Sequence, residues 1–320
     1  MAEDVVRHEE LGQLQALANG IVEQVGLVVR GRREVAELAV VVLLAEGHLL
    51  LEDVPGVGKT TLAKALAAAV DCTLGRIQFT PDLMPSDLIG THLYQAAKGE
   101  FAFVPGPVFA NIVIADEINR ASPKTQSALL QAMQEGQVTV DTSTYRLPRP
   151  FAVIATQNPI EMAGTYPLPE AQRDRFMARI SVGYPSAEQE QAMLSDQETA
   201  DPLDRVVPAA TAGQINTAVQ AVRRIHTAKA VKDYITRLAI ATRAWPDLAL
   251  GASPRASLHL LRAAKALAVL RGREFVVPDD VQKLLQPLWA HRLVLNQQAR
   301  GAGRTAGQVL ADVVTRVPVQ

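Results

Sequence analysis

The chain has 320 residues, of which 48% are hydrophobic and 20% are charged. This balance is typical of a folded protein with a substantial core, and it excludes a disordered chain. The formal net charge of −1 at pH 7 excludes a protein that a global excess of positive charge would draw to nucleic acid or anionic lipid.

The cysteine content and the apolar runs indicate the cellular compartment of the protein. The single cysteine, Cys72, cannot form an internal disulfide, which suits a reducing compartment. The N-terminal stretch MAEDVVRHEE is acidic and is unlike a secretion signal, and the longest apolar run, residues 38–45, is too short to span a bilayer. We therefore predict a cytoplasmic protein without a membrane span.

Apolar spacing predicts two helices before the first strand. Residues 11–25 and 32–46 have apolar side chains at helical intervals, and residues 48–52 form a short apolar strand. An Ala/Leu/Lys-rich tract at 61–70 predicts the next helix, and residues 76–80 predict a second strand.

The stretch LLLEDVPGVGKTT, residues 49–61, joins the first strand to its helix through a glycine-rich turn, as a phosphate-binding loop requires. Glycines let backbone N–H groups approach phosphate oxygens, and the helix adds the positive end of its dipole. Lys59 would reach the β- and γ-phosphates, and the Thr60 hydroxyl would bind Mg²⁺. Asp53 stands where the usual pattern has its first glycine, and a chance Gly-Lys-Thr turn is the alternative interpretation.

The segment 81–111 is rich in proline and glycine. It predicts a short helix at 85–89 and a small hairpin around Lys98 and Gly99. A compact domain does not need such a segment for stability, so we interpret it as an insertion that serves a partner.

Polar side chains follow two predicted buried strands. Asp116 and Glu117 come directly after the strand at 112–115, and Asn158 follows the strand at 151–155. Such positions lie in the ligand crevice of an open α/β sheet, where Asp116 would hold Mg²⁺ and Glu117 would orient or deprotonate the attacking water. The alternatives are a strand that simply ends in charged residues and an asparagine that only makes a turn.

The next elements lead to a predicted domain boundary near residues 183–185. They are a capped helix at 122–135, a hairpin with strands at 137–140 and 145–147, a charged helix at 169–177 and a strand at 180–182. The charged helix carries Arg173 and Arg175, and a solvated surface helix is its default interpretation.

The rest of the chain predicts a small helical bundle. Its helices are expected at residues 186–196, 209–223, 229–244, 254–271 and 279–291. Arg255 begins one of them, where the helix dipole disfavours a cation unless an anion lies nearby, and a bound phosphate would supply that anion.

Four segments in this order resemble the AAA+ ATPases, and most closely the MoxR family. The resemblance runs from about Val28 to Arg300 and is carried by GHLLLEDVPGVGKTTLA, NIVIADEINRASPKTQSALLQAMQEGQVTV, FAVIATQNPIEMAGTYPLPEAQRDRFM and ASPRASLHLLRAAKALA. It implies a doubly wound α/β fold: a P-loop AAA+ parallel-sheet domain of the helix-2-insert type, residues 1–184, and an α-helical lid domain, residues 185–320.

The resemblance also implies roles for individual residues. The nucleotide would be bound by Pro55, Gly56, Val57, Gly58, Lys59, Thr60, Thr61 and Arg255, the last as the second sensor. Thr60 and Asp116 would hold the metal, and the catalytic residues would be Glu117, the first sensor Asn158, the arginine finger Arg175 and Lys59. Arg173 competes with Arg175 for the finger role, and whether Arg255 acts in cis or in trans stays open.

The function that the resemblance implies is Mg²⁺-dependent hydrolysis of ATP to ADP. It would drive chaperone-like remodelling, maturation or activation of a client protein by a ring, expected to be a hexamer, with a von Willebrand factor A-type protein as companion. A nucleic-acid motor and a nucleotide-switched scaffold are the alternatives. The near-neutral charge argues against the first, and the presence of both Glu117 and Asn158 argues against the second.

Overall fold

The structure is a computed structural model. It describes residues 6–29, 31–52, 58–158, 165–181, 183–184, 186–188, 190–191 and 201–319. Within these residues, no helix is both long and apolar enough to cross a membrane.

A parallel sheet of five strands forms the centre of the N-terminal part of the chain. Its strands are β1 (Leu49–Glu52), β2 (Leu74–Gln78), β5 (Ile112–Asp116), β8 (Ala152–Gln157) and β9 (Ala178–Ile180). They lie in the order β2-β5-β8-β1-β9, all parallel. The chain leaves β1 for the far edge and later places β9 on the other side of β1, so the strand order reverses there, as at the ligand crevices of doubly wound folds. The predicted fold class is confirmed.

Both faces of the sheet are covered, which explains the unbroken apolar runs in its strands. In β5, Ile112 and Ile114 belong to one buried cluster, whereas Val113 and Ala115 belong to another. Successive side chains of a strand point to opposite faces, so a strand buried on both sides needs apolar residues at every position. The helices involved are α1 (His8–Val28), α2 (Arg33–Leu44) and α3 (Lys59–Ala69) in the first cluster, and α4 (Pro85–Ile89) and α5 (Pro123–Glu135) in the second.

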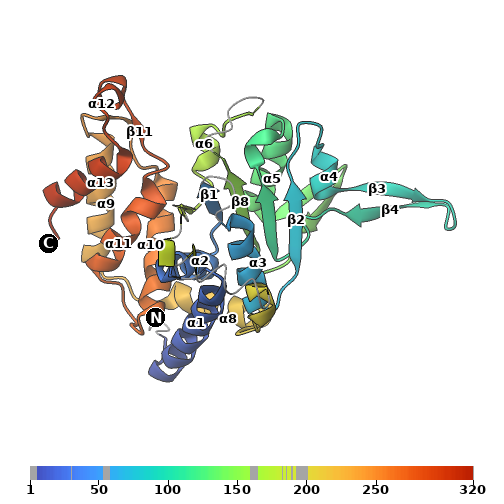
Figure 1. Ribbon diagram of the computed structural model, residues 1–320, viewed down its shortest axis with the longest axis horizontal. Coiled ribbons are helices and arrows are strands. Elements are labelled where there is room, and N and C mark those ends of the chain that lie inside the picture. Colours follow the sequence, from blue (N-terminus) through green and yellow to red (C-terminus); the bar gives the residue numbers. More distant parts are fainter. Residues whose placement is uncertain are drawn as a thin grey trace.

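The C-terminal part is helical. Its helices are α8 (Ala212–Arg224), α9 (Lys229–Arg243), α10 (Pro254–Leu270), α11 (Pro278–Trp289), α12 (Gln297–Gly301) and α13 (Ala306–Arg316). Helices α9 to α13 form a lid on the left of Figure 1, and α8 lies below the centre beside α1. A small antiparallel ribbon joins β10 (Leu248–Leu250) to β11 (Val294–Leu295). The ribbon was not predicted, because strands of two or three residues carry almost no periodic signal. Helix α13 was not predicted either, although its buried Val309, Leu310 and Val313 have helical spacing.

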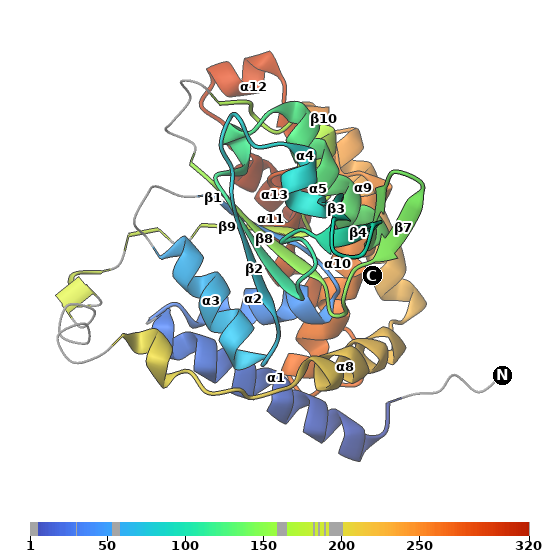
Figure 2. The ribbon, with the colours of Figure 1, turned by 90° about the vertical axis from the view of Figure 1, so that its right-hand side faces the viewer.

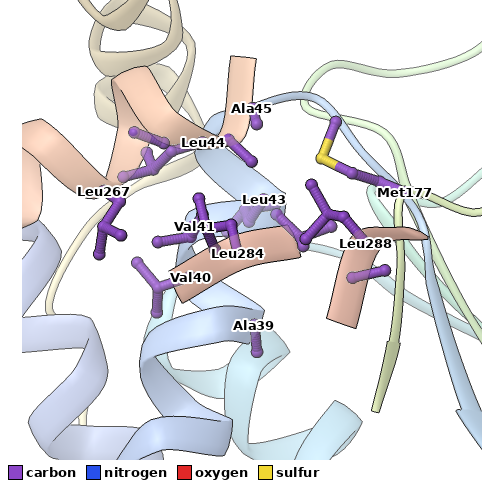
Figure 3. Close-up of a cluster of buried hydrophobic side chains, with 14 of the residues drawn as sticks. Ala39, Val40, Val41, Leu43, Leu44, Ala45, Met177, Leu267, Leu284 and Leu288 are labelled. Atoms are coloured by element: carbon purple, nitrogen blue, oxygen red, sulfur yellow. The ribbon is translucent and has the colours of Figure 1, made fainter. Parts of the chain in front are cut away.

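The lid and the sheet domain share one hydrophobic core. Figure 3 shows Val40, Val41 and Leu44 of α2 beside Leu267 of α10 and Leu284 of α11. Helix α2 therefore packs against the lid as well as belonging to the cluster on the sheet, which is why its residues from Ala39 to Leu44 are buried without interruption. The predicted domain boundary near residue 184 separates segments whose cores are continuous in space.

Two hairpins extend from the sheet domain. One pairs β3 (Gly90–Gln95) with β4 (Glu100–Pro105) and projects away from the other elements, on the right of Figure 1. The other pairs β6 (Gln137–Val140) with β7 (Ser143–Arg146). Gly90 has φ of +91°, and a Cβ there would lie 2.3 Å from the Val104 carbonyl oxygen, so the base of the first hairpin requires glycine.

One predicted helix is wrong in extent. Instead of a charged helix over residues 169–177, the structure has the short helix α6 (Glu170–Arg173), followed by a turn. Phe176 and Met177 are fully buried, and the Met177 N–H donates to the His48 carbonyl oxygen at the start of β1 (2.8 Å). Burial of these two side chains and pairing with β1 outweigh the local preference for helix. The predicted helix at 186–196 lies largely outside the described residues.

Strand boundaries shift by up to two residues. The predicted strand at 76–80 is observed as β2, Leu74–Gln78, and the one at 180–182 is observed as β9, Ala178–Ile180. The pairing partners set these limits, because β2 and β9 are edge strands that run only as far as their neighbours β5 and β1.

Candidate functional site

The carboxyl edge of the sheet brings the predicted metal residues together. The Thr60 hydroxyl, in the first turn of α3, donates to Oδ1 of Asp116 at the end of β5 (3.2 Å). Asp116 is 5% exposed, and its other oxygen accepts from Arg76 Nε (2.9 Å). A hydroxyl and a carboxylate at this separation are hard oxygen ligands of the kind that Mg²⁺ takes, usually together with substrate phosphates and water.

Glu117 follows β5 in the left-handed backbone conformation, with φ of +57°. Its N–H donates to Thr156 Oγ1 (2.9 Å), and its carboxylate accepts from Gln78 Nε2 (3.0 Å) and Arg120 (2.9 Å). Such a conformation is costly for a residue other than glycine, so the contacts with β2 and β8 have to hold it in place.

Asn158 lies directly after β8, on the strand between β5 and β1, and is 7% exposed. Thr156 in β8 donates to Asp116 Oδ1 (3.4 Å) while accepting from the backbone of Glu117. The ends of β5 and β8 therefore hold Asp116, Glu117 and Asn158 at one edge of the sheet, as the sequence predicted.

The phosphate loop is described only in part. Pro55, Gly56 and Val57 lie outside the described residues, as does the side chain of Lys59, whose backbone begins α3. Gly58 precedes α3 in the left-handed conformation, with φ of +84°, where glycine costs least. Thr61 is half-buried in the first turn of the same helix.

A second cluster lies at the opposite, amino edge of the sheet. Arg175 and Arg255 line a pocket of about 250 Å³ together with Arg262, His259 and the segment from Glu46 to His48. That segment leads into β1, and Arg175 precedes β9, so the pocket lies where these strands begin. Arg173 is absent from the described lining and pairs with Glu170 (3.4 Å).

The electrostatics of this pocket are dominated by its arginines. Burial, and then the positive charge of Arg255, lower the pKa of Arg175, against a smaller opposing effect of the Glu135 charge. Glu46 lies in the pocket wall, and Asp174 is 3.8 Å from Arg255 and accepts from the hydroxyl of Ser253, the residue that caps α10. Asp174 thus supplies the anion that a cation at the start of a helix requires.

The two clusters are separated by the length of the sheet. Strand β5 has five residues at about 3.3 Å each, so its two ends lie about 13 Å apart. The arrangement leaves Thr60, Asp116, Glu117 and Asn158 on one side and the two arginines on the other.

A larger cavity, of about 520 Å³, opens near the carboxyl end of β9. Its wall is mostly apolar, with Val35 and Leu38 of α2 and Leu284 of α11, and Ile180 and Ser181 border it. Its volume falls within the range of sites for small organic ligands.

The sequence did not single out several residues that hold the site. Arg76 and Gln78 bond to Asp116 and Glu117, but they lie within a strand pattern that shows only its alternation. Thr156, which the sequence places at this edge without a role, bonds to both Asp116 and Glu117. A signal existed in β2, where polar side chains at positions 76 and 78 alternate with apolar ones and reach the same side as Asp116.

Comparison with known proteins agrees with this architecture. The model of the ATPase family associated with various cellular activities (AAA) matches residues 48–178, and that of the AAA lid domain matches residues 240–313. A crystal structure of a candidate ATPase from Cytophaga hutchinsonii is 37% identical, with a TM-score of 0.91 over 98% of this chain and 97% of that one.

Two curated relatives extend along most of the chain. Chaperone MoxR1 of Mycobacterium tuberculosis is 44% identical over 285 residues, which are 86% of this chain and 75% of that protein. Protein MoxR of Paracoccus denitrificans is 35% identical over 316 residues, 90% of each. With this identity over most of its length, and with the sheet, the lid and the polar strand ends in place, the chain belongs to the MoxR family of AAA+ ATPases.

Proposed function

We propose that this ATPase cleaves the β–γ bond of ATP, with Mg²⁺, at the carboxyl edge of its sheet. The contact between Thr60 Oγ1 and Asp116 Oδ1 carries the proposal, because it joins the helix after the phosphate loop to the end of a buried strand. A metal held by Thr60 and Asp116 would neutralise charge on the phosphates.

The remaining residues of this edge would bind and orient the reactants. The loop from Pro55 to Gly58, with Lys59 and Thr61, would bind the phosphates through backbone N–H groups and one ammonium. Glu117 would accept the proton of the attacking water, and Asn158 would hold that water and the γ-phosphate. The cavity beside Ile180 and Ser181 would take the nucleobase, since its wall is mostly apolar and it opens near the end of a strand next to β1.

Arg175 and Arg255 would act on a nucleotide bound by an adjacent subunit. They share a pocket at the amino edge, about the length of the sheet from Asp116, which supports a role in trans for both. Arg173 pairs with Glu170 instead, so Arg175 is the better candidate for the finger. A closed ring gives each subunit one such neighbour, and we propose a hexamer.

We propose a chaperone-like use of this hydrolysis, because a 44% identical relative is named a chaperone. The hairpin β3–β4 would contact the client, since Tyr94 and Phe101 are 59% and 71% exposed on one of its faces. A cytoplasmic location and a companion with a von Willebrand factor A-type domain belong to the same proposal.

The test of the hydrolytic site is Glu117→Gln. The variant should bind ATP like the parent protein and lose at least about a hundredfold in kcat, because only the group that accepts the proton is removed. Glu274→Gln makes the same chemical change at an exposed position of the lid and should leave turnover unchanged. Parental turnover in Glu117→Gln would refute the assignment.

The test of action in trans mixes two inactive proteins. Arg175→Ala should lose about a thousandfold or more in rate, as removal of an arginine finger does. When it is mixed with Glu117→Gln, turnover should return, because an intact Arg175 of one subunit then lies beside an intact Glu117 of the next. Turnover no higher than that of the separate proteins would contradict the trans arrangement.

A further inference from the structure

We propose that Arg262 is a third arginine that contacts the phosphate oxygens of the nucleotide bound by the adjacent subunit. The inference rests on the proposed function, in which Arg175 and Arg255 meet that nucleotide. Arg262 is not among the site residues expected from the sequence, and it lies on the same helix as Arg255.

The geometry of α10 puts Arg262 on the face that carries Arg255. Arg255, Leu258, His259 and Arg262 are spaced by three, four and seven residues, so they share one side of the helix. All four line the 250 Å³ pocket that Arg175 closes from the segment before β9. Arg262 lies about 10 Å along the axis from Arg255, and a polyphosphate is long enough to meet both side chains.

Among the residues that the structure describes, none forms an ion pair with Arg262. It makes no hydrogen bond or salt bridge to any of the residues that the structure describes, and its side chain is exposed. Glu46, the carboxylate among the described lining residues, instead accepts from Arg223 through Nε (3.0 Å) and a second nitrogen. An arginine fork with five donors is suited to a phosphate, and the described part of the chain leaves that of Arg262 available.

His259 adds a neutral donor to the same face. Its Nδ1 accepts from Arg292 (2.7 Å), so Nε2 carries the proton and remains available as a donor. Burial, followed by the positive charges of Arg292 and Arg262, lowers the pKa of His259 to about 2, so the ring stays uncharged at neutral pH. The pocket therefore combines three guanidinium groups with an N–H donor.

Crowding of cations explains why the ligand should be a polyanion. Three guanidinium groups line one pocket and repel one another, and after burial the charge of Arg255 is the next cause that lowers the pKa of Arg175. The triphosphate of an adjacent subunit carries several negative charges in a row and would relieve that repulsion along the length of the face.

The experiment compares Arg262→Ala and Arg262→Lys with the parent in steady-state hydrolysis of ATP. The alanine variant should lose about tenfold in kcat, and the lysine variant should recover part of the loss because it keeps the charge. Mixing Arg262→Ala with Glu117→Gln should restore turnover, since a subunit with an intact Arg262 then lies beside an intact Glu117. Lys232→Ala, which removes an exposed charge from α9, should behave as the parent.

The outcomes separate this inference from the proposed function. If Arg175→Ala and Arg255→Ala lose turnover while Arg262→Ala keeps at least half of it, the trans site stands and the role of Arg262 is refuted. If mixing restores the turnover of neither Arg175→Ala nor Arg262→Ala, the trans arrangement in the proposed function is refuted, and the role of Arg262 is refuted with it. If Arg262→Ala loses turnover and mixing with Glu117→Gln does not restore it, the inference is also refuted, because the defect would then act within the subunit.

Discussion

Single side chains set the charge balance around the metal residues. Asp116 accepts from Arg76 on one oxygen and from Thr60 and Thr156 on the other. The guanidinium of Arg76 lies on the carboxylate that would bind a divalent cation, so it should oppose that binding while it orients the side chain.

Arg76→Ala should therefore lower the Mg²⁺ concentration that gives half-maximal ATP hydrolysis. The side chain of Arg76 is 55% exposed, and solvent screening limits the effect to about 1 kcal/mol, or about fivefold in concentration. A titration of Mg²⁺ at saturating ATP measures it. Arg146→Ala, at an exposed position of β7, is the matched control, and an unchanged or higher midpoint in Arg76→Ala would contradict the prediction.

Another residue, His48, connects three elements at the amino edge. Its Nδ1 accepts from the Val153 N–H (3.0 Å), so its Nε2–H donates to the Met133 carbonyl oxygen (3.1 Å). Burial lowers the pKa of His48 to about 4, against an ordinary value of 6.5. The unfolded chain therefore binds this proton between pH 6.5 and 4 while the folded chain does not.

Stability should fall as the pH drops through that interval. His48 accounts for about 3 kcal/mol of the loss in the free energy of unfolding, because its pKa is lowered by about 2.5 units and each unit is worth about 1.36 kcal/mol. His48→Gln should show a shallower fall in the free energy of unfolding by urea between pH 7 and 4.5. His8→Gln, at an exposed position, should keep the parental slope, and an equal slope in both variants would count against the buried neutral histidine.

At the scale of elements, the two hairpins are joined by aromatic side chains. Residues opposite each other in an antiparallel pair share a face, so His92 and Phe103 lie on one side of β3–β4. Phe103 stacks on Tyr145 of β7 with ring centroids 4.0 Å apart, and His92 bonds to Asp141 (2.9 Å) and to the Tyr145 hydroxyl (3.2 Å). The projecting hairpin is thus fastened to the second one.

His92→Ala should loosen the projecting hairpin without unfolding the domain. Amide hydrogen exchange in Gly90–Gln95 and Glu100–Pro105 should become about tenfold faster, the equivalent of about 1.4 kcal/mol in local opening. Leu93→Ala changes the neighbouring residue of β3, which is 52% exposed on the other face, and should leave exchange as in the parent. Equal protection in both variants would mean that His92 does not fasten the hairpin.

At the scale of the whole molecule, buried charge as well as apolar packing holds the lid on the sheet domain. Glu37 of α2 accepts from Arg271 at the end of α10 (2.7 and 3.3 Å) and lies 3.7 Å from Lys283 of α11. Burial acts to raise the pKa of Glu37, but the hydrogen bond and charge of Arg271, with those of Arg33 and Lys283, outweigh it and leave the pKa below its ordinary value.

Glu37→Gln should lower the free energy of unfolding by about 1–3 kcal/mol at neutral pH. Because the folded-state pKa is lowered, this contribution is present at neutral pH and is lost as the pH falls below about 4.5, through the pKa of the folded state. Urea unfolding at pH 7 measures the effect, with Glu34→Gln at an exposed position of α2 as the control. A variant as stable as that control would show that apolar packing alone holds the lid.

The sequence by itself determined the elements and the chemistry that depend on local patterns. The apolar runs, the turn after β1 and the polar residues after β5 and β8 are contiguous in the chain, so periodicity and spacing were sufficient to predict a parallel sheet with Asp116 and Asn158 at one edge. The same local patterns led to a wrong prediction for residues 169–177, because burial of Phe176 and Met177 in the core outweighs the local preference for helix.

Only the tertiary structure decided that Arg175 and Arg255 lie together at the amino edge of the sheet. Arg175 and Arg255 are 80 positions apart, and no spacing rule relates a segment before β9 to the start of α10. Helices α2, α10 and α11 contribute to one hydrophobic core, which holds α10 against the sheet domain. Figure 2 shows α10 and α11 behind the sheet. Contacts between distant segments depend on how whole elements pack, and that packing is a property of the folded chain, not of any window of residues.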